Sequence, residues 1–410
     1  MISYEEALAT LRNPGRLKTI TLPVGEASGY VAARDVTSEV LVPPFANSAM
    51  DGFAVYSENL ADASKESPVT LPIAGSTVAG DTPCVARSGA WEIMTGAPVP
   101  QGYDAVVKIE DVAVRGHDVT FMAPAQGKNN MREAGEDFLI GDAVVHSGTL
   151  LTPYHVMALA TVGHKDVTVY SKPNITIFST GKELIEEADS PLLPGQIRNA
   201  NGPYLMAALQ ESGFQPSYGG MIADDPTVFE TRIRETLSEA DILISTGAVS
   251  AGRHDFIPEC LRKLGAKIVF HKVAIRPGKP VLYARFPDGT HYFGLPGNPV
   301  SAAVGLRFFV VPLLRHLQGM EQESPITARL LMPSPKKKGL RCFRKSHVSV
   351  TTGGRLQLEI LHGQESFKIH PMLRANCWAS FAEDQDGTEI GAAVQIYPLM
   401  PGRWGLGAVS

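Results

Sequence analysis

The stretch NITIFSTGKELIEE, residues 174–187, indicates the fold of the central part of the chain. Its apolar run ITIFST predicts a short buried strand, Gly181 predicts a turn, and the acidic segment that follows predicts a helix. The turn from Thr180 to Glu183 has three possible roles: it holds a phosphate, it holds a metal ion, or it only connects two elements. The rest of the sequence decides between them.

Strand and helix patterns alternate from this stretch to about residue 320. The helix patterns PYLMAALQES, TVFETRIRETL and FIPECLRKL follow or precede apolar strands such as DILIST. This alternation predicts a parallel sheet covered by helices on both faces, in which ligands bind beyond the carboxyl ends of the strands. The segment ILISTGAVSAG repeats the Ser-Thr-Gly turn of the opening stretch, so two similar loops are expected at one edge of the sheet.

The regions outside the alternating part have other sequence patterns. Ser3 and Glu6 have capping-box spacing for a first helix, and Thr152-Pro153 begins a second helix that Gly163 ends. Short apolar runs broken by Gly and Pro predict β-rich segments before and after the alternating part. We therefore predict an α/β multidomain protein, with a three-layer parallel-sheet domain, small β-rich domains and a C-terminal β-barrel-like domain. The predicted domains are residues 1–46 with 140–172, 47–139, 173–322 and 323–410.

Composition excludes several classes of partner. The 410 residues include 37 basic and 42 acidic side chains, and the net charge of -5 gives no general attraction to nucleic acid or anionic lipid. The four cysteines have no C-x-x-C spacing, so reduced thiols are expected. The N-terminus lacks a signal-peptide pattern, and no apolar stretch is expected to reach the roughly 20 residues that span a bilayer. We predict a cytoplasmic protein that binds neither nucleic acid nor membrane.

The two strand-end loops, Ser179 to Glu183 and Ser245 to Asp255, are the first candidates for chemistry. Lys182 suggests a phosphate-binding P-loop, but the required G-x-x-x-x-G-K-[ST] pattern is absent. The carboxylates Glu183, Asp224 and Asp255 lie at element junctions. They either cap helices or supply oxygen ligands to Mg²⁺, which commonly shares them with a substrate phosphate.

Three further segments have both a structural and a functional interpretation. Asp51-Gly52 is either a hairpin turn or part of a site, because polar and small residues surround it. Lys272, Arg276 and Lys279 form either a solvated surface or an anion site that Pro and Gly preorganise. The Pro296–Pro299 turn starts a long apolar helix, which is compatible with a core role and with backbone donors for an anion.

Taken in order, these segments resemble the molybdopterin molybdenumtransferase family, that is, MoeA and the C-terminal E domain of gephyrin. The resemblance covers nearly the whole chain and is carried by the motifs PPFANSAMDGFAV, IMTGAPVPQGYDAVVKIED, REAGEDFLIGDAVV, FSTGKEL, GQIRNANGPYL, ISTGAVSAGRHDF, KVAIRPGKP and GLPGNPVSA. It implies the final step of molybdenum cofactor synthesis, in which molybdate enters adenylylated molybdopterin and AMP is released with Mg²⁺ as cofactor. It also implies an elongated homodimer of four-domain subunits, a cleft between the α/β domain of one subunit and the small β domain of the other, and contact with the molybdopterin adenylyltransferase.

The resemblance assigns roles residue by residue. The implied catalytic residues are Asp51, Glu183 and Asp255, and the implied metal ligands are Glu183, Asp224 and Asp255. Asp137 matches a further acidic position without a specified role. The implied substrate-binding residues are Thr95, Ser179, Thr180, Gly181, Ser245, Lys272, Arg276, Lys279, Pro296, Gly297, Asn298 and Pro299.

The chain departs from the family pattern at several of these motifs. Lys182 and Arg253 replace Asp, Ala248 replaces Gly, and Asn199 stands where Asp is common. In the C-terminal segment GQESFKIHPMLRAN, Phe367 replaces His and His370-Pro371 replaces two serines. The two charge reversals raise the cleft charge by about +4, which is enough to alter Mg²⁺ affinity or to favour a more anionic ligand. A noncatalytic molybdopterin-binding or scaffold protein, or an enzyme that inserts tungstate, is therefore the alternative hypothesis.

Overall fold

The computed structural model describes residues 1–186, 191–247, 256–336, 338–402 and 404. The chain divides into two compact units. Unit 1 comprises residues 1–20, 29–33 and 169–410, and unit 2 comprises residues 21–28 and 34–168. The finer division into four domains stays a prediction.

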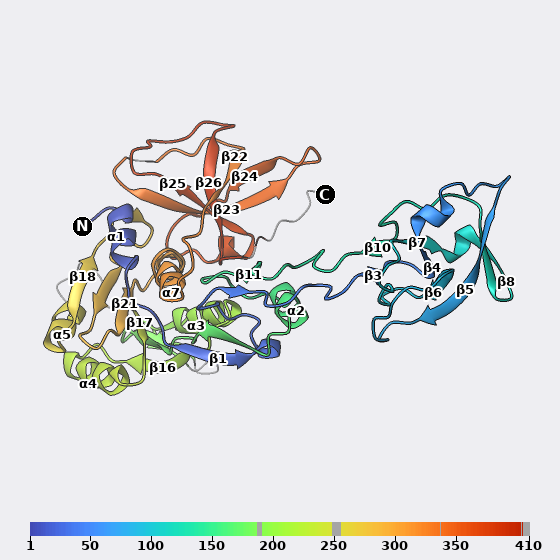
Figure 1. Ribbon diagram of the computed structural model, residues 1–410. Coiled ribbons are helices and arrows are strands. Elements are labelled where there is room, and N and C mark those ends of the chain that lie inside the picture. The colour runs from blue at the N-terminus through green and yellow to red at the C-terminus, as the bar shows by residue number, and fades with distance from the viewer. Residues whose placement is uncertain (187–190, 248–255, 337, 403, 405–410) are drawn as a thin grey trace. The chain divides into compact units, whose positions relative to one another are not determined.

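The α/β part of unit 1 is built on a six-stranded sheet in the order β16-β13-β17-β21-β20-β18 (Figure 1). Its strands are β13 (Ile175–Thr180), β16 (Ser217–Ile222), β17 (Ile242–Thr246), β18 (Lys267–His271), β20 (Leu282–Arg285) and β21 (His291–Leu295). Four neighbouring strands are parallel, as predicted, whereas β20 pairs antiparallel with both β21 and β18. The sheet is therefore mixed, because the short Asp288-Gly289 turn reverses the chain between β20 and β21.

Helices cover both faces of this sheet and make three layers. One core contains Ile177 and Ile244 of the sheet and side chains of α1 (Tyr4–Leu11), α3 (Asn201–Glu211), α6 (Pro299–Gly305) and α7 (Val311–Leu317). The other contains Phe178 and Leu243 and side chains of α4 (Pro226–Leu237) and α5 (Ile257–Lys263). Successive strand residues point to opposite faces, so each strand contributes to both cores. The predicted three-layer architecture is confirmed.

The segment after Gly181 differs from the prediction. Leu184–Ile185 form the short strand β14, which pairs in parallel with β15 (Ile197–Arg198), and the predicted acidic helix does not begin there. Main-chain bonds to the distant Ile197 segment satisfy this backbone, and local sequence does not reveal such a partner. The prediction of a helix directly after the turn was wrong.

The predicted helix boundaries elsewhere are confirmed. The Ser3 hydroxyl accepts from the Glu6 N–H at 3.2 Å and the Glu6 carboxylate accepts from the Ser3 N–H at 2.7 Å, which is the predicted capping box of α1.

One helical run extends from Pro299 to Leu317 and consists of α6, the π-helical turn η4 (Leu306–Val310) and α7. By length and composition it is apolar enough to cross a membrane. The long apolar helix after the Pro296–Pro299 turn was predicted, but not that it reaches this length. Of its apolar 18-residue window, 83% is buried inside the protein, where it forms core.

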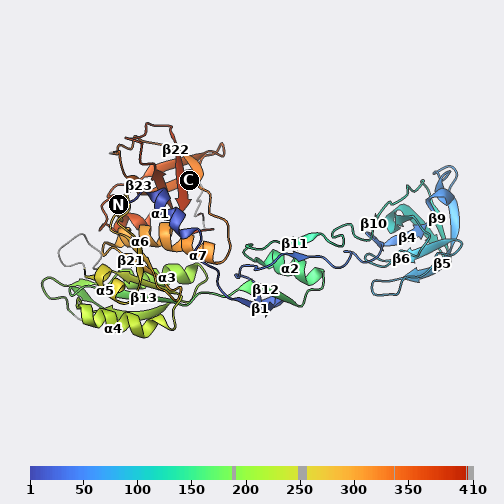
Figure 2. The same ribbon diagram turned by 60° about the vertical axis from the view of Figure 1, so that its left-hand side comes forward.

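The C-terminal part of unit 1 is a closed barrel (Figure 2). Its five strands pair in the cyclic order β23-β24-β22-β26-β25-β23, and the short strand β19 (Ile275–Arg276) adds to β23. They are β22 (Ile326–Leu330), β23 (Arg341–Val350), β24 (Leu356–Ile360), β25 (Cys377–Phe381) and β26 (Ala393–Pro398), with the 3₁₀ turn η5 (His370–Leu373) before β25. The predicted C-terminal β barrel is confirmed.

Unit 2 is mainly β. Its six-stranded sheet has the order β7-β4-β6-β5-β9-β8 and encloses a core around Phe53, Val55 and Phe121. The sheet strands are β4 (Gly52–Val55), β5 (Val69–Thr77), β6 (Ala90–Ile93), β7 (Ala105–Lys108), β8 (Val112–Arg115) and β9 (Asp118–Phe121). The other elements are η1 (Val24–Glu26), β2 (Val36–Thr37), β3 (Asn47–Ser48), η2 (Ser57–Leu60), η3 (Ile109–Asp111), β10 (Met131–Arg132), β11 (Ala143–Val145) and α2 (Pro153–Thr161). β1 (Thr19–Pro23) pairs with β12 (Asp166–Tyr170) where the chain passes between units.

Candidate functional site

The carboxyl ends of β13, β17 and β21 lie next to one another in unit 1. The parallel register pairs Ser179 with Thr246 and Thr246 with Leu295, so the loops after the three strands leave the sheet at the same level. Open parallel sheets bind ligands at this edge. The two similar Ser-Thr-Gly turns recognised in the sequence are thus brought to one edge, which we call the strand-end edge.

Glycine allows the main chain to approach closely at this edge. Gly247 has φ +100°, and a Cβ there would lie 2.0 Å from the Thr180 carbonyl oxygen. Its N–H donates to Leu295 O at 3.2 Å, and the Thr180 hydroxyl donates to Thr246 O at 2.9 Å. A side chain at position 247 would therefore push the first two loops apart.

Two buried oxygens at this edge have no hydrogen-bond partner in the described part of the chain. They are Thr246 Oγ1 and Asn201 Oδ1. The amide nitrogen of Asn201 donates to Gly297 O at 2.7 Å, which fixes the side chain against the turn after β21. Buried polar atoms are nearly always hydrogen-bonded in folded proteins, so these two oxygens are suited to a bound polar ligand.

The predicted carboxylates are only partly brought together. Asp224 accepts from the main-chain N–H of Lys182 at 3.1 Å, which ties the loop after β16 to the loop after β13. The exposed Glu183 folds back on its own turn, since a Cβ on Gly181 would lie 2.8 Å from Glu183 Oε1. Asp255 lies outside the described residues. Among those that are described, no group of three His, Cys, Asp or Glu side chains is close enough to hold a metal ion.

The predicted serines are buried beneath the edge. Ser179 is fully buried and bonds Asn199, and the Asn199 amide donates to the Tyr218 hydroxyl at 2.9 Å. Tyr218 in turn donates to Glu186 in a very short hydrogen bond, and burial, then Glu186, raises the pKa of Tyr218 to about 12. Ser245 is also fully buried and bonds Tyr292. The two serines hold the sheet edge in place, and their predicted contact with substrate stays a prediction.

Two of the three predicted cations line a groove between the α/β part and the barrel. Two adjoining cavities, of about 580 and 510 Å³, share Arg276, Pro277, Leu340 and Gln364 in their walls. Lys279, Pro296 and Asn298 line the second cavity. Lys272 lines neither, and its main-chain N–H donates to Val281 O at 3.1 Å in the turn, where Lys272 has φ +72°. We call the two cavities together the cationic groove.

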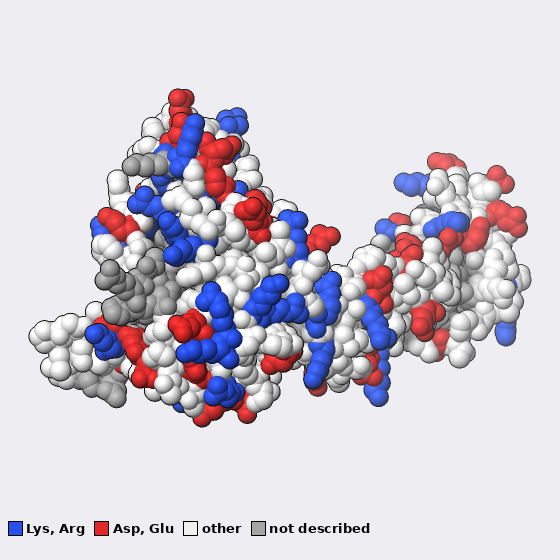
Figure 3. All heavy atoms as spheres, turned by 90° about the vertical axis from the view of Figure 1, so that its left-hand side faces the viewer, with Lys and Arg blue, Asp and Glu red and all other residues white. Residues whose placement is uncertain are grey.

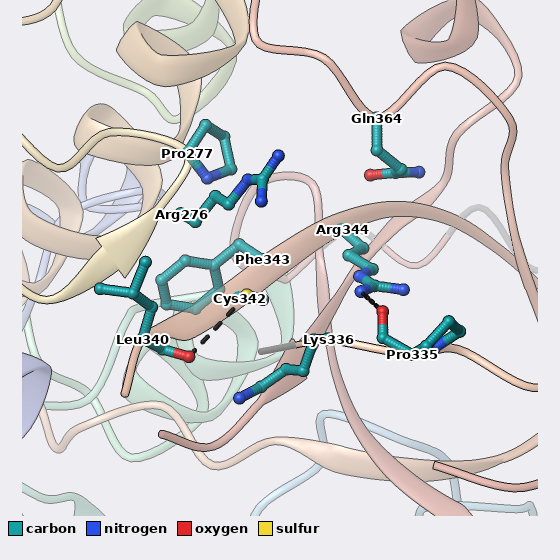
Figure 4. A pocket seen from close by; sticks show the side chains of 9 residues that line it. All are labelled: Arg276, Pro277, Pro335, Lys336, Leu340, Cys342, Phe343, Arg344 and Gln364. Atoms are coloured by element: carbon teal, nitrogen blue, oxygen red, sulfur yellow. Dashed lines mark hydrogen bonds between the residues drawn. The ribbon is translucent and has the colours of Figure 1, made fainter. Parts of the chain in front are cut away.

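The barrel supplies cations that sequence reasoning missed. Arg344 and Lys336 line the first cavity with Arg276 (Figure 4). Arg344 donates to Pro335 O at 2.5 Å, and burial, followed by the charge of Arg276, lowers the pKa of Arg344. The pairing of Arg276 with Cys342 across β19 and β23 brings the two arginines to one place. This pairing is a long-range contact, so no local pattern in the sequence pointed to Arg344.

The C-terminal segment that departs from the family pattern forms the other wall. Gln364 lines both cavities, and Glu365, Ser366 and Phe367 line the second. The Ser366 hydroxyl accepts from Asn298 Nδ2 at 3.0 Å, and Ser366 O accepts from the Val300 N–H at 3.0 Å. The turn at Pro296–Pro299 therefore contacts the barrel directly, and one of the helix N–H groups that follow it is already occupied.

Unit 2 holds the remaining predicted residues. Asp51 Oδ1 accepts from the Thr95 N–H at 2.7 Å and from the Thr95 hydroxyl at 2.9 Å. These bonds, the main-chain one first, lower the pKa of the Asp51 carboxyl. The exposed Asp51 is thus an ionised carboxylate held in one orientation, and Asp137 lies elsewhere in a turn with its main chain bonded to Val42 O.

Comparison with known proteins agrees with this geometry. Residues 2–163 match a MoeA N-terminal region, domains I and II, and residues 176–316 match a probable molybdopterin binding domain. The molybdopterin molybdenumtransferase of Synechococcus elongatus is 36% identical over 92% of this chain and 94% of its own length. The chain belongs to the molybdopterin molybdenumtransferase family.

Further relatives extend the family match to the full length. The molybdopterin molybdenumtransferase of Haemophilus influenzae is 33% identical over 97% of this chain and 99% of its own. The crystal structure of a molybdopterin biosynthesis MoeA protein from Pyrococcus horikoshii has TM-score 0.82 and 28% identity, covering 97% of this chain and 99% of that one. The recognised family is confirmed, and the alternative of a noncatalytic scaffold is not favoured.

Proposed function

We propose that the protein inserts molybdate into adenylylated molybdopterin and releases AMP, the last step of molybdenum cofactor synthesis. The observation that carries the proposal is the cationic groove, in which Arg276, Lys279 and Arg344 come together next to the molybdopterin-binding sheet. Guanidinium and ammonium groups suit a tetrahedral oxyanion, because they offer several charge-assisted donors. On the face shown in Figure 3, acidic and basic side chains are interspersed.

The strand-end edge would take the phosphate end of the pterin substrate. Gly247 and Gly297 let the strand-end loops approach one another closely, and Asn201 Oδ1 and Thr246 Oγ1 provide buried polar atoms for a ligand. During the reaction, water adds across the phosphoanhydride bond, so AMP leaves and the phosphate of molybdopterin remains. The two dithiolene thiols bind molybdenum, and their protons leave with one oxide ligand as water.

Mg²⁺ is part of the proposal. Glu183 and Asp224 supply oxygen donors on two loops joined by the Lys182 main chain, which suits a cation that uses one or two carboxylates and shares the substrate phosphates. Asp255 would be the third carboxylate. Bound there, Mg²⁺ would neutralise charge on the leaving phosphate. For Asp51, which Thr95 holds in one orientation, we propose the catalytic role that the family resemblance implies.

The decisive experiment supplies purified protein with adenylylated molybdopterin, molybdate and Mg²⁺ and measures AMP. The Synechococcus elongatus relative, assayed in parallel, is the positive control. We expect AMP release that depends on molybdate. Release no greater than in buffer, with the control active, would reject the proposed function.

Three further proposals rest on the family resemblance. We propose a homodimer, a cytoplasmic location and a contact with the molybdopterin adenylyltransferase that produces the substrate. Light scattering of the purified protein measures the first, and a monomer mass would contradict it. Molybdate is the proposed oxyanion, and competition between molybdate and tungstate in the AMP assay measures the preference.

A further inference from the structure

Lys345 is a fully buried lysine in the middle of β23. Its ammonium group donates to three main-chain carbonyl oxygens, those of Gly363, Glu365 and Lys368, the last two at 3.1 and 3.0 Å. All three acceptors belong to one segment, residues 363–368, which leaves the barrel after β24. The side chain thus binds a single loop at three points.

This loop is the barrel wall of the cationic groove. Gln364 lines both of its cavities. The Gln364 side chain is bonded to the main chain of Lys345, with Oε1 accepting from the Lys345 N–H at 3.0 Å and Nε2 donating to Lys345 O at 2.9 Å. On its other side the loop contacts the α/β part, through Ser366 to Asn298 and Val300. Lys345 therefore anchors one side of a wall whose other side faces the proposed molybdate.

The buried ammonium of Lys345 is unfavourable for the stability of the barrel core. Burying a charge costs several kcal/mol unless hydrogen bonds compensate, and an apolar side chain of the same length would fill the space without this cost. Burial lowers the pKa of Lys345, and the nearby Glu365 acts in the opposite direction. Because every compensating side-chain bond goes to the loop, the charge serves the loop more than the barrel core.

We propose that Lys345 is a positioning residue that holds residues 363–368 in the conformation that binds molybdate in the cationic groove. The identity of the ligand, molybdate, rests on the proposed function, whereas the contacts of Lys345 with residues 363–368 do not. Lys345 does not line the groove, so it acts through Gln364 and its neighbours. The proposal predicts a loss of molybdate affinity without a comparable loss of affinity for the pterin substrate.

The first test is independent of activity. Lys345→Met removes the charge and keeps the stem, and Lys368→Met is the matched control, since it removes one charge from the same loop but its side chain is half-exposed and paired with Glu365. Hydrogen exchange is measured on the Lys368 and Val300 amides, which donate to Glu365 O and Ser366 O. We expect exchange in Lys345→Met to be about tenfold faster or more, because the loop loses three charge-assisted bonds. Unchanged exchange would overturn the proposal.

The second test measures AMP release against molybdate concentration. In Lys345→Met we expect the half-saturating molybdate concentration to rise about tenfold, and that of adenylylated molybdopterin to change less than about threefold. Lys345→Arg, which keeps the cation, should recover part of the molybdate affinity. An equal loss for both substrates, or a fall in kcat alone, would contradict a positioning role.

Two outcomes separate this inference from the proposed function. If the unaltered protein releases no AMP, the proposed function fails, and hydrogen exchange still tests Lys345. If Lys345→Met does not fold, Lys345→Gln takes its place, because its side chain stays polar but is uncharged, one atom shorter and has only two N–H donors for the three carbonyl oxygens. A folded Lys345→Gln with normal loop exchange and normal molybdate dependence would show that the charge and the three bonds are not needed, and would overturn the inference.

Discussion

The strand-end edge and the cationic groove are the two proposed anion-binding regions of unit 1, and they are built by different means. At the edge, main-chain atoms come so close that a Cβ at Gly247 would lie 2.0 Å from a carbonyl oxygen. In the groove, side-chain cations from separate segments, Arg276 and Arg344, face one space. The edge is a feature of backbone shape, and the groove is a feature of charge.

This difference predicts different responses to substitution. A site formed by closely packed main-chain atoms tolerates almost no added atom, because no change of rotamer relieves a clash with a main-chain carbonyl. A site formed by charged side chains tolerates changes of shape. Its affinity for an anion falls with each charged donor that is removed. The predictions that follow are ordered from the largest expected effect to the smallest, and each can break this distinction.

Gly247→Ala should have the largest effect. We expect loss of about 3 kcal/mol or more in the free energy of unfolding, together with loss of AMP release, because the new Cβ meets Thr180 O and the φ of +100° is unfavourable for alanine. Urea denaturation and the AMP assay measure the two effects. The control is Gly289→Ala, where φ is +99° but a Cβ would meet nothing within 4 Å. A similar cost in both variants would show that backbone conformation matters and close approach does not.

Acid should destabilise the sheet that carries the strand-end edge. His291 begins β21, is buried beside Tyr283, and burial lowers its pKa to about 4. The unfolded chain binds this proton near pH 6.5, so stability is full above that value and falls as the pH decreases towards 4, by up to about 3 kcal/mol. Urea midpoints between pH 7 and pH 4 measure the slope.

The matched variant for this slope is His291→Gln. It should flatten the slope in part only, because burial also lowers the pKa values of His271 and His316. An identical slope in the variant and in the unaltered protein would contradict the assignment to His291.

The edge could be predicted from sequence and the groove only in part, for a physical reason. The Ser-Thr-Gly turns and the apolar strands before them are local patterns, and parallel strand ends meet at one edge by geometry. Arg276 and Lys279 are also recognisable around their Pro-Gly turn. Arg344 and Lys345 are not, because β19–β23 pairing and a buried ammonium place them, and neither leaves a local trace. The helix prediction after Gly181 was wrong for the same reason, because Leu184–Ile185 pair with a strand that is distant in sequence.

Arg276→Met should weaken molybdate binding and leave the fold intact. We expect the half-saturating molybdate concentration for AMP release to rise about 10- to 100-fold, because one exposed guanidinium of the groove is lost. Arg374→Met is the control, since Arg374 pairs with Glu359 on the barrel and lines neither cavity. Equal molybdate dependence in the two variants would show that the groove does not bind the oxyanion.

Lys182→Asp should have the smallest effect, and it tests the edge by charge instead of shape. The substitution restores the family's carboxylate next to Glu183 and Asp224 and keeps the main-chain N–H that Asp224 accepts. Both side chains at positions 182 and 183 are exposed, so solvent and salt screen the two-unit change in charge. We expect the Mg²⁺ concentration that half-saturates AMP release to fall about three- to fivefold at low salt, and the difference to shrink at high salt. Lys263→Asp, equally exposed on α5, controls for net charge. The same shift in both variants would mean that the overall charge of the protein sets the Mg²⁺ affinity. A shift confined to Lys182→Asp would place the cation at the strand-end edge, where the glycines bring the loops together.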